Sequence, residues 1–254
     1  MRERIELKSA DEIARIREAS LIVHDVLQEV IAAIAPGITT LEIDRIAARA
    51  TAARGAEPAF LGYHGYPAVI WVAVNDEVVH GIPSRRVLEE GDIVGLDFGV
   101  LYRGFHGDSA YTVPVGTAAP GALRLLETTR EALARAIGAA RPDARLGDLG
   151  FAVQSYVEAR GYSVVRDFVG HGIGRRLHEP PQVPNFGAPG TGMRLRPGLV
   201  LALEPMVNAG GWEVRTLDDG WTAVTADVQL SAHFEHTIAV TDDGPEVLSL
   251  PPKG

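Results

Sequence analysis

Apolar and polar residues alternate at helical spacing along the first part of the chain. A capping box at residues 9–12, with Ser first and Glu last, opens a predicted amphipathic helix over residues 10–35. A proline and a glycine at 36–37 end it. A second capping box at residues 39–42 opens another predicted helix, which continues to Gly55. The pattern therefore predicts two consecutive helices.

An internal repeat relates the two halves of the chain. Residues 36–55 align without gaps on residues 142–161, so that the proline and the glycine that bound each copy coincide. Each copy follows an amphipathic helix and precedes strand-like sequence, with helices at 10–35 and 123–140 and strands at 68–74 and 162–166. The repeat predicts a single domain, residues 1–254, whose similar halves, roughly 1–117 and 118–254, enclose a site between them.

Period-two alternation over residues 94–113 predicts a β-hairpin with a two-residue turn at 103–104. That turn sets Asp97 opposite Ala110 and brings Asp97 and Asp108 onto one face as diagonal neighbours. Two carboxylates in an apolar strand pair repel each other unless a cation or a proton lies between them. The hairpin therefore predicts either a metal site or an acid/base dyad.

Three more residues are candidates for the same centre. Glu204 lies in a predicted strand at 199–205 and Glu235 in another at 231–241, while His171 lies in the glycine-rich segment GHGIG at 170–174. One divalent ion cannot neutralise four carboxylates, but two ions can. Oxygen-rich ligands with one imidazole suit Mn, Fe or Co. His80 and His178 are candidates to hydrogen-bond a substrate carbonyl or amide.

The composition of the chain excludes several classes of function and of site. The chain has 254 residues, 46% of them hydrophobic and 22% charged, with a net charge of −9, which argues against a broad nucleic-acid-binding surface. It has no cysteine, which excludes disulfides, thiolate metal sites and a cysteine nucleophile. The charged first ten residues lack the apolar core of a signal peptide, and glycine and proline break the longest uncharged stretch. A cytoplasmic protein without a membrane partner is expected.

Four motifs carry a resemblance to a known family. They are LGYHGYP at 61–67, NDEVVHGIP at 75–83, Asp97 with GFHGD at 104–108, and GHGIG at 170–174 followed by His178, Glu204 and Glu235. In this combination the chain resembles the type I methionine aminopeptidases, members of the pita-bread metallopeptidases. The resemblance implies an α+β pita-bread fold: two pseudo-symmetric αβ halves, a curved antiparallel sheet covered by helices, and a dinuclear metal site between the halves.

The resemblance also implies a role for each metal ligand. Asp97 holds one ion, His171 and Glu204 hold the other, and Asp108 and Glu235 bridge the two. A hydroxide that bridges the ions attacks the scissile carbonyl, and Glu204 relays its proton to the leaving amine.

Further residues are implied to bind the substrate and a second kind of cation. His80 contacts the scissile amide nitrogen and His178 the carbonyl. The residues implied to line the methionine pocket are Phe60, Tyr63, Tyr66, Trp71, Leu177 and Trp221. The backbone near Asn75 and Glu77, together with Ser231, is implied to bind a monovalent cation, Na or K.

The implied activity is removal of the initiator methionine from nascent proteins with a small second residue. The implied partners are nascent N-termini, with the ribosome as a further candidate, and the implied state is a monomer. An Xaa-Pro aminopeptidase or prolidase shares the five metal ligands, but the motifs at 61–67 and 75–83 argue against it. A non-catalytic pita-bread module is the other alternative, although such modules usually lack the metal ligands.

Overall fold

The computed structural model describes residues 5–251. Within that range the helices are α1 (Ala10–Ala32), α2 (Thr40–Ala53), α3 (Pro120–Ala139) and α4 (Leu146–Glu158), with a 3-10 turn at Tyr63–Gly65. The strands are β1 (Glu57–Pro58), β2 (Trp71–Val74), β3 (Glu77–Val79), β4 (Ile93–Tyr102), β5 (Phe105–Pro114), β6 (Ser163–Val164), β7 (Gly170–Gly172), β8 (Glu179–Val183), β9 (Val200–Leu203), β10 (Met206–Asn208), β11 (Val214–Thr216), β12 (Ala223–Thr225), β13 (Ser231–His233), β14 (Glu235–Thr241) and β15 (Gly244–Val247).

One large antiparallel sheet forms the centre of the molecule. Its strand order is β1-β4-β5-β14-β9-β7-β8, and β2 and β15 pair with β4 and β14 off this path. Strand β14 joins the halves, because it pairs with β5 from the first half and with β9 from the second. Two three-stranded sheets, β13-β10-β6 and β11-β12-β3, flank it. The predicted curved antiparallel sheet is confirmed.

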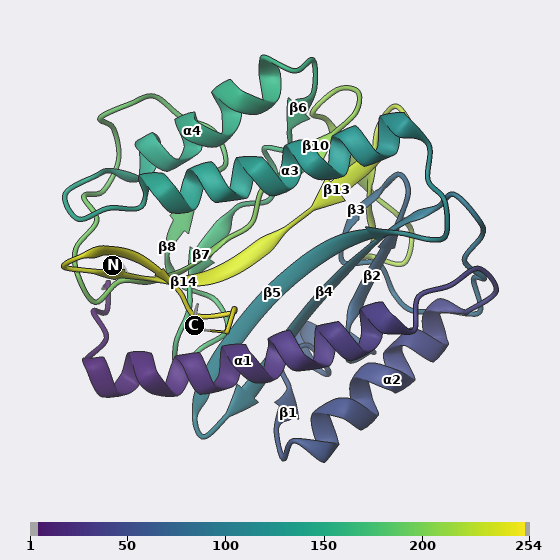
Figure 1. Cartoon of the computed structure of the whole chain (residues 1–254), viewed down its shortest axis with the longest axis horizontal. Helices are drawn as coiled ribbons and strands as arrows, with labels where there is room; N and C mark the ends of the chain where they lie inside the picture. Colours follow the sequence, from purple (N-terminus) through teal and green to yellow (C-terminus); the bar gives the residue numbers. More distant parts are fainter. Residues whose placement is uncertain (1–4, 252–254) are drawn as a thin grey trace.

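The helices cover the sheet in two pairs. Figure 1 shows α1 and α2 beside the strands of the first half, and α3 and α4 beside those of the second. Val94, Leu96 and Phe98 of β4 pack in one buried cluster with residues of α1 and α2. Since side chains alternate along a strand, Asp97 points to the opposite face, away from these helices. Covering one face of the sheet with helices leaves the other face to the polar residues.

The central hairpin has the predicted register. Tyr102 pairs with Phe105, Asp97 with Ala110, and Gly99 with Asp108. The turn residues Arg103 and Gly104 have φ of 49° and 83°, the positive values that a two-residue hairpin turn of the primed type requires. The two aspartates are therefore diagonal neighbours on one face, as predicted.

Both glutamate-bearing strands of the second half are interrupted where continuous strands are predicted. Strand β9 ends at Leu203 and β10 begins at Met206, while β13 and β14 are separated at Phe234. The physical reason is a change of sheet: β9 pairs with β14 in the large sheet, whereas β10 pairs with β13 in a small one. Pro205 has no backbone N–H, so it cannot donate the hydrogen bond that would continue the strand pairing. Glu204 and Glu235 thus lie where two adjacent strands leave the large sheet together.

The two repeat copies become α2 and α4, each preceded by a longer helix, α1 or α3. Their first turns are closed in the same way. The Glu42 carboxylate accepts a hydrogen bond from the Thr39 backbone N–H at 2.8 Å, and Asp148 accepts one from the Arg145 N–H at 2.7 Å. The capping box of α1 is also present. None of the helices within residues 5–251 combines the length and apolarity that a membrane crossing needs.

A buried ion pair attaches the N-terminal segment to the second half. Lys8 Nζ lies 2.7 Å from Glu179 Oε2, and both side chains are at most 5% exposed. Glu179 also accepts a hydrogen bond from the Arg176 N–H, so the pair fastens the loop that carries His178. Removing one member of such a pair leaves an uncompensated buried charge.

We expect Lys8→Met to lower the free energy of unfolding by about 3–5 kcal/mol, measured by urea denaturation. The double variant Lys8→Met/Glu179→Leu should recover most of that loss. The matched control is Arg15→Met, which removes an exposed ion pair to Asp11 and should cost no more than about 1 kcal/mol. If Lys8→Met lowered the free energy of unfolding as little as the control does, the buried pair would contribute little to stability.

Candidate metal centre

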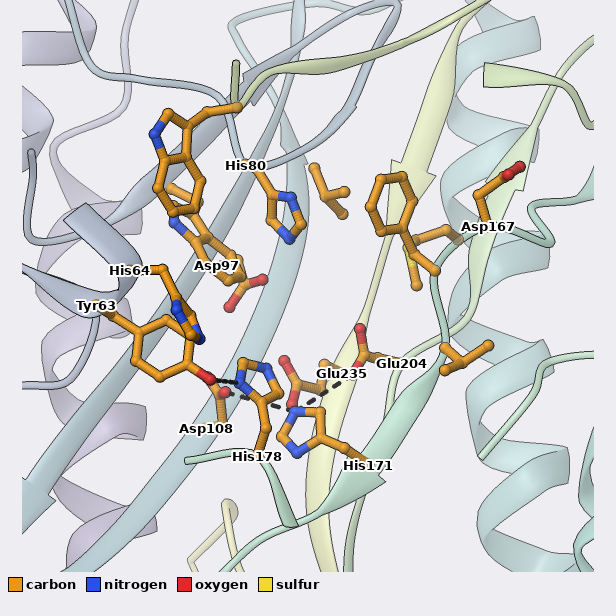
Figure 2. Close-up of a pocket in the computed structure, with 16 residues that line it drawn as sticks. Tyr63, His64, His80, Asp97, Asp108, Asp167, His171, His178, Glu204 and Glu235 are labelled. Atoms are coloured by element: carbon orange, nitrogen blue, oxygen red, sulfur yellow. Dashed lines mark hydrogen bonds and ion pairs between the residues drawn. The ribbon is translucent and has the colours of Figure 1, made fainter. Parts of the chain in front are cut away.

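A cavity of about 350 Å³ opens on the helix-free face of the sheet, between the halves (Figure 2). It brings together all five residues predicted to bind metal, from strands far apart in the sequence. The residues that line it are Tyr63, His64, Trp71, Val79, His80, Asp97, Asp108, Asp167, Phe168, Val169, His171, His178, Glu204, Met206, Trp221 and Glu235.

The two aspartates of the β4–β5 hairpin are the metal-ligand candidates that the first half contributes to the cavity. Asp97 is 6% and Asp108 3% exposed. The Asp108 carboxylate accepts one hydrogen bond from the Ser109 N–H, whereas Asp97 Oδ1 has no hydrogen-bond partner among residues 5–251. A buried carboxylate oxygen without a partner is costly. The unpaired oxygen indicates a cation site.

His171 presents a free nitrogen to the carboxylates. Its Nδ1 lies 2.9 Å from the Gly172 carbonyl oxygen, which has only acceptor capacity, so Nδ1 carries the proton and donates it. The lone pair is then on Nε2, which lies 3.4 Å from Glu204 Oε1 and 4.0 Å from Asp108 Oδ2. In metal-binding histidines, the ring nitrogen that does not bind the metal typically donates its N–H to a backbone carbonyl or another acceptor.

Burial and mutual repulsion shift the proton equilibria of the whole cluster. Burial raises the pKa of Asp108 to about 7. Burial, and then the charges of Asp108 and Glu204, raise the pKa of Asp97 well above its ordinary value. The pKa of Glu235 is raised for the same reasons. Burial lowers the pKa of His171 to about 3, so the ring is neutral and able to bind a metal. A divalent cation among these groups would remove the repulsion and favour the ionised carboxylates.

Two overlapping groups of ligand atoms contain three of the four carboxylates. Asp97, His233 and Glu235 offer atoms within 4.8 Å of one another, and so do Asp108, His171 and Glu235. Glu235 is shared, its residue is 2% exposed, and its Oε1 has no hydrogen-bond partner in the described part of the chain. Four carboxylates exceed what an acid/base dyad needs. The donor set fits divalent metal ions, with Glu235 common to two sites.

The two other predicted histidines lie on the wall of the cavity. His80 has φ of 65°, an uncommon backbone conformation, and its ring stands against Trp71 and Phe168 at centroid distances of 4.3 and 5.1 Å. Burial lowers the pKa of His80 to about 4. His178 Nδ1 lies 2.6 Å from the Tyr63 hydroxyl, and its ring centroid is 4.2 Å from that of His171.

The six residues predicted for the methionine pocket lie in one apolar cluster but at two depths. Tyr63, Trp71 and Trp221 line the cavity. The other three are buried behind them: Phe60, which stacks on Trp71 with centroids 4.0 Å apart, Tyr66 and Leu177. They shape the pocket through the residues in front.

Residues predicted for a monovalent cation are brought close together. The Ser231 N–H donates to the Asn75 carbonyl at 2.9 Å. The Glu77 carboxylate is engaged elsewhere, by Arg86 and by the Val74 N–H.

Sequence reasoning missed several residues that line the cavity or the metal cluster. His233 lies in the cluster, and the signal that could have found it is the period-two alternation of residues 231–241, which puts it on the same strand face as Glu235. His64 lies in the motif at 61–67 and could have been found there. Nothing in the sequence pattern singles out Asp167, Phe168 or Met206, since strand contacts from distant parts of the chain bring them in.

Known proteins resemble this chain over nearly its whole length. The model of metallopeptidase family M24 matches residues 14–242. A methionine aminopeptidase of Clostridium perfringens is 50% identical over 244 residues, which are 96% of this chain and 98% of that protein. The crystal structure of a methionine aminopeptidase from Thermotoga maritima superposes with a TM-score of 0.96 at 45% identity, covering 98% of this chain and all of the other.

A prolidase is a more distant relative. The structure of the prolidase from Pyrococcus horikoshii superposes with a TM-score of 0.79 at 25% identity, and the match covers 97% of this chain but 64% of the prolidase. The fold is therefore common to both groups, whereas sequence identity and coverage distinguish them. The chain belongs to metallopeptidase family M24 and, within it, to the type I methionine aminopeptidases.

Proposed function

We propose that the chain removes the initiator methionine from nascent proteins with a small second residue, using two divalent metal ions. The observation that carries this proposal is the pair of ligand groups sharing Glu235 inside a cavity with aromatic walls. The names of the relatives at about 50% identity agree with it.

In the proposed centre Asp97 would hold one ion, His171 and Glu204 would hold the other, and Asp108 and Glu235 would be shared by the two. The short distance between His171 Nε2 and Glu204 Oε1 and the shared position of Glu235 support this assignment. The oxygen-rich donor set suits Co, Mn or Fe. Such ions supply an activated water and polarise the substrate carbonyl.

Glu204 is proposed to pass a proton to the leaving amine. Its side chain is 14% exposed, against 4% for Asp108 and 9% for Asp97, so it is more accessible to a substrate than either aspartate. Asn185 holds the backbone of Glu204 by donating to its carbonyl at 3.0 Å, which leaves the carboxylate free. A carboxylate positioned in this way can take up a proton and release it again.

His178 is proposed to donate a hydrogen bond to the substrate carbonyl. Burial raises the pKa of the Tyr63 hydroxyl, so that hydroxyl keeps its proton and can donate it to His178 Nδ1. The imidazole then carries its own proton on Nε2. A donor at that position stabilises the negative charge that develops on the carbonyl oxygen.

His80 is proposed to contact the scissile amide nitrogen. Its ring is held between Trp71 and Phe168 and is neutral at pH 7, since burial lowers its pKa to about 4. The aromatic residues that line the same cavity, Trp71, Tyr63 and Trp221, suit the thioether of a methionine, whose sulfur gains about 0.3–1.5 kcal/mol in an aromatic contact.

The remaining proposals concern the whole protein. The chain acts as one catalytic domain, residues 1–254, because strand β14 pairs with strands of both halves. It acts in the cytoplasm as a monomer, on nascent N-termini, with the ribosome as a further partner. A monovalent cation, Na or K, binds to backbone groups near Asn75 and Glu77 and to Ser231; the contact between Ser231 and Asn75 supports this site.

Protein stripped with a chelator and reloaded with Mn or Co should release methionine from a Met-Ala-Ser peptide and leave Ala-Pro-Ala uncut. Free amino acids measured by chromatography give the result, and the stripped protein is the control. Cleavage of Ala-Pro-Ala alone would assign the chain to the Xaa-Pro peptidases. Absence of metal-restored cleavage of either peptide would leave a non-catalytic module.

Substitutions at Asp108 and His178 should separate metal binding from catalysis. Asp108→Ala removes a bridging carboxylate and should abolish both metal retention and turnover. His178→Ala removes a donor to the carbonyl and should lower kcat/KM about 10²–10³-fold with metal content unchanged. Elemental analysis and peptide kinetics measure the two effects. Equal metal loss in both variants would make His178 a metal ligand and refute the proposed role.

A further inference from the structure

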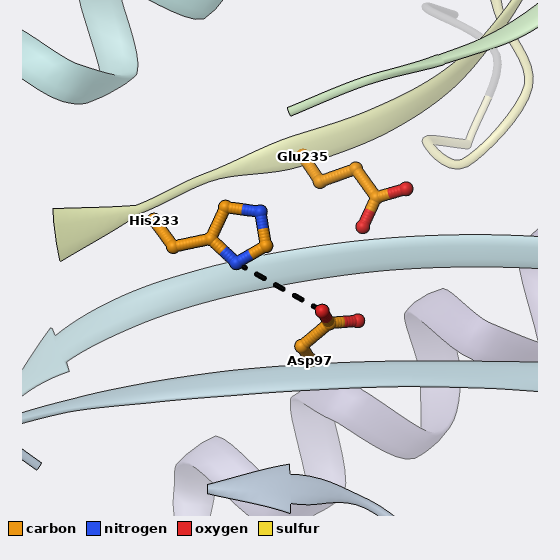
Figure 3. Close-up of side chains that lie close together, drawn as sticks. All are labelled: Asp97, His233 and Glu235. Carbon is orange, nitrogen blue, oxygen red and sulfur yellow. Dashed lines mark ion pairs between the residues drawn. The ribbon is translucent and has the colours of Figure 1, made fainter. Parts of the chain in front are cut away.

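His233 is a buried histidine in the metal cluster that the five assigned ligands leave without a role. It ends strand β13, is 3% exposed and lies on the same side as Glu235 (Figure 3). Its Nδ1 is 3.9 Å from Asp97 Oδ2, and its Nε2 is 3.9 Å from Glu204 Oε2. The ring therefore lies between carboxylates that are proposed to bind different ions.

Neither ring nitrogen makes a hydrogen bond with these carboxylates. A distance of 3.9 Å is too long for one, and within residues 5–251 Nε2 is a buried atom with no partner. The His233 backbone is nevertheless held firmly, because its N–H donates to Thr112 Oγ1 and its carbonyl accepts from the same hydroxyl. An unpaired imidazole in such a fixed, buried place requires an explanation.

The chemistry of a neutral imidazole at His233 supplies an explanation. In a neutral imidazole one nitrogen bears a proton and the other a lone pair. With a carboxylate beyond each nitrogen, the lone pair faces a negative group in either tautomer. A cation between the lone pair and the carboxylates removes this repulsion, while the other nitrogen can donate its proton.

The two sides of the ring are not equivalent. Asp97 faces Nδ1, and Asp97, Glu235 and His233 offer ligand atoms within 4.8 Å of one another. Ligand atoms about 2.1 Å from one ion are at most about 4.2 Å apart, so the separation of 3.9 Å on either side of the ring satisfies this limit, and the second carboxylate, Glu235, distinguishes the Asp97 side. Glu204 alone faces Nε2. The cation therefore belongs on the Nδ1 side.

We propose that His233 is a sixth protein ligand, which binds the Asp97 metal ion through Nδ1 and keeps its proton on Nε2, the nitrogen that faces Glu204. This inference rests on the proposed function, because it adds a ligand to the proposed centre. It gives each ion an imidazole, His171 on one side and His233 on the other. Imidazole ligands at both sites favour Fe or Co over Mg or Ca.

The test is to titrate the full chain, labelled with ¹⁵N in its histidine rings, with Zn²⁺ as a diamagnetic probe. The ring nitrogens of the eight histidines report protonation and metal binding in long-range ¹H–¹⁵N spectra. The signals of His171 and His233 should both move to metal-bound positions, with Nδ1 bound in His233 and Nε2 bound in His171. Gln variants of His171, His178 and His233 assign the signals.

A second measurement is the Zn²⁺ affinity of the variants by calorimetry. His233→Gln should weaken one of two binding events about 10–100-fold. The matched control is His236→Gln, which removes a neighbouring half-buried histidine whose Nδ1 pairs with Ser249 Oγ at 2.9 Å, and which should leave both events unchanged.

Two outcomes separate the inference from the proposal on which it rests. Zn²⁺ that shifts His171 but leaves His233 as in the metal-free protein would overturn the sixth ligand and keep the metal centre. Zn²⁺ that shifts neither would overturn the metal centre itself. If His233→Gln fails to fold, the wild-type spectrum still decides, because it shows whether a second histidine besides His171 binds the metal.

Discussion

The repulsion among four buried carboxylates is the constraint on which the rest of this structure depends. Asp97, Asp108, Glu204 and Glu235 converge on one cavity; burial raises the pKa of each, and the charges of neighbouring carboxylates raise those of Asp97, Glu204 and Glu235 further. Residues 5–251 place no lysine or arginine in the lining of that cavity. Such a cluster is unfavourable on its own, and divalent cations turn the same repulsion into binding free energy. The fold has to hold these side chains together against their mutual repulsion.

The architecture does so by dividing the ligands between rigid elements of both halves. The β4–β5 hairpin fixes two aspartates through ten paired positions. In the second half, β9 and β14 leave the large sheet side by side, and their glutamates lie where the chain changes sheets. Because β14 also pairs with β5, the two sets of ligands are set at a fixed spacing by backbone hydrogen bonds. Packing of α1–α2 and α3–α4 on the opposite face supplies the hydrophobic stabilisation.

How far the sequence predicts this arrangement depends on the range of the interaction. The helix starts at Ser9 and Thr39 and the register across the hairpin follow from local rules, and these predictions are confirmed. The interruptions after Leu203 and at Phe234 escape prediction, since they arise when distant strands pair in a second sheet. His233 illustrates the same limit: its face is readable from alternation, but its approach to Asp97 and Glu204 depends on β4 and β9. Roles within the centre came from family resemblance rather than from periodicity.

The most direct test of the account is a crystal structure of the protein grown with Mn²⁺, with anomalous scattering recorded at the manganese edge. Two anomalous peaks are expected in the cavity, about 3.5–4 Å apart, with density for Glu235 reaching both. A single peak, or two peaks that Glu235 does not bridge, would contradict the claim that these buried carboxylates exist to hold a pair of ions.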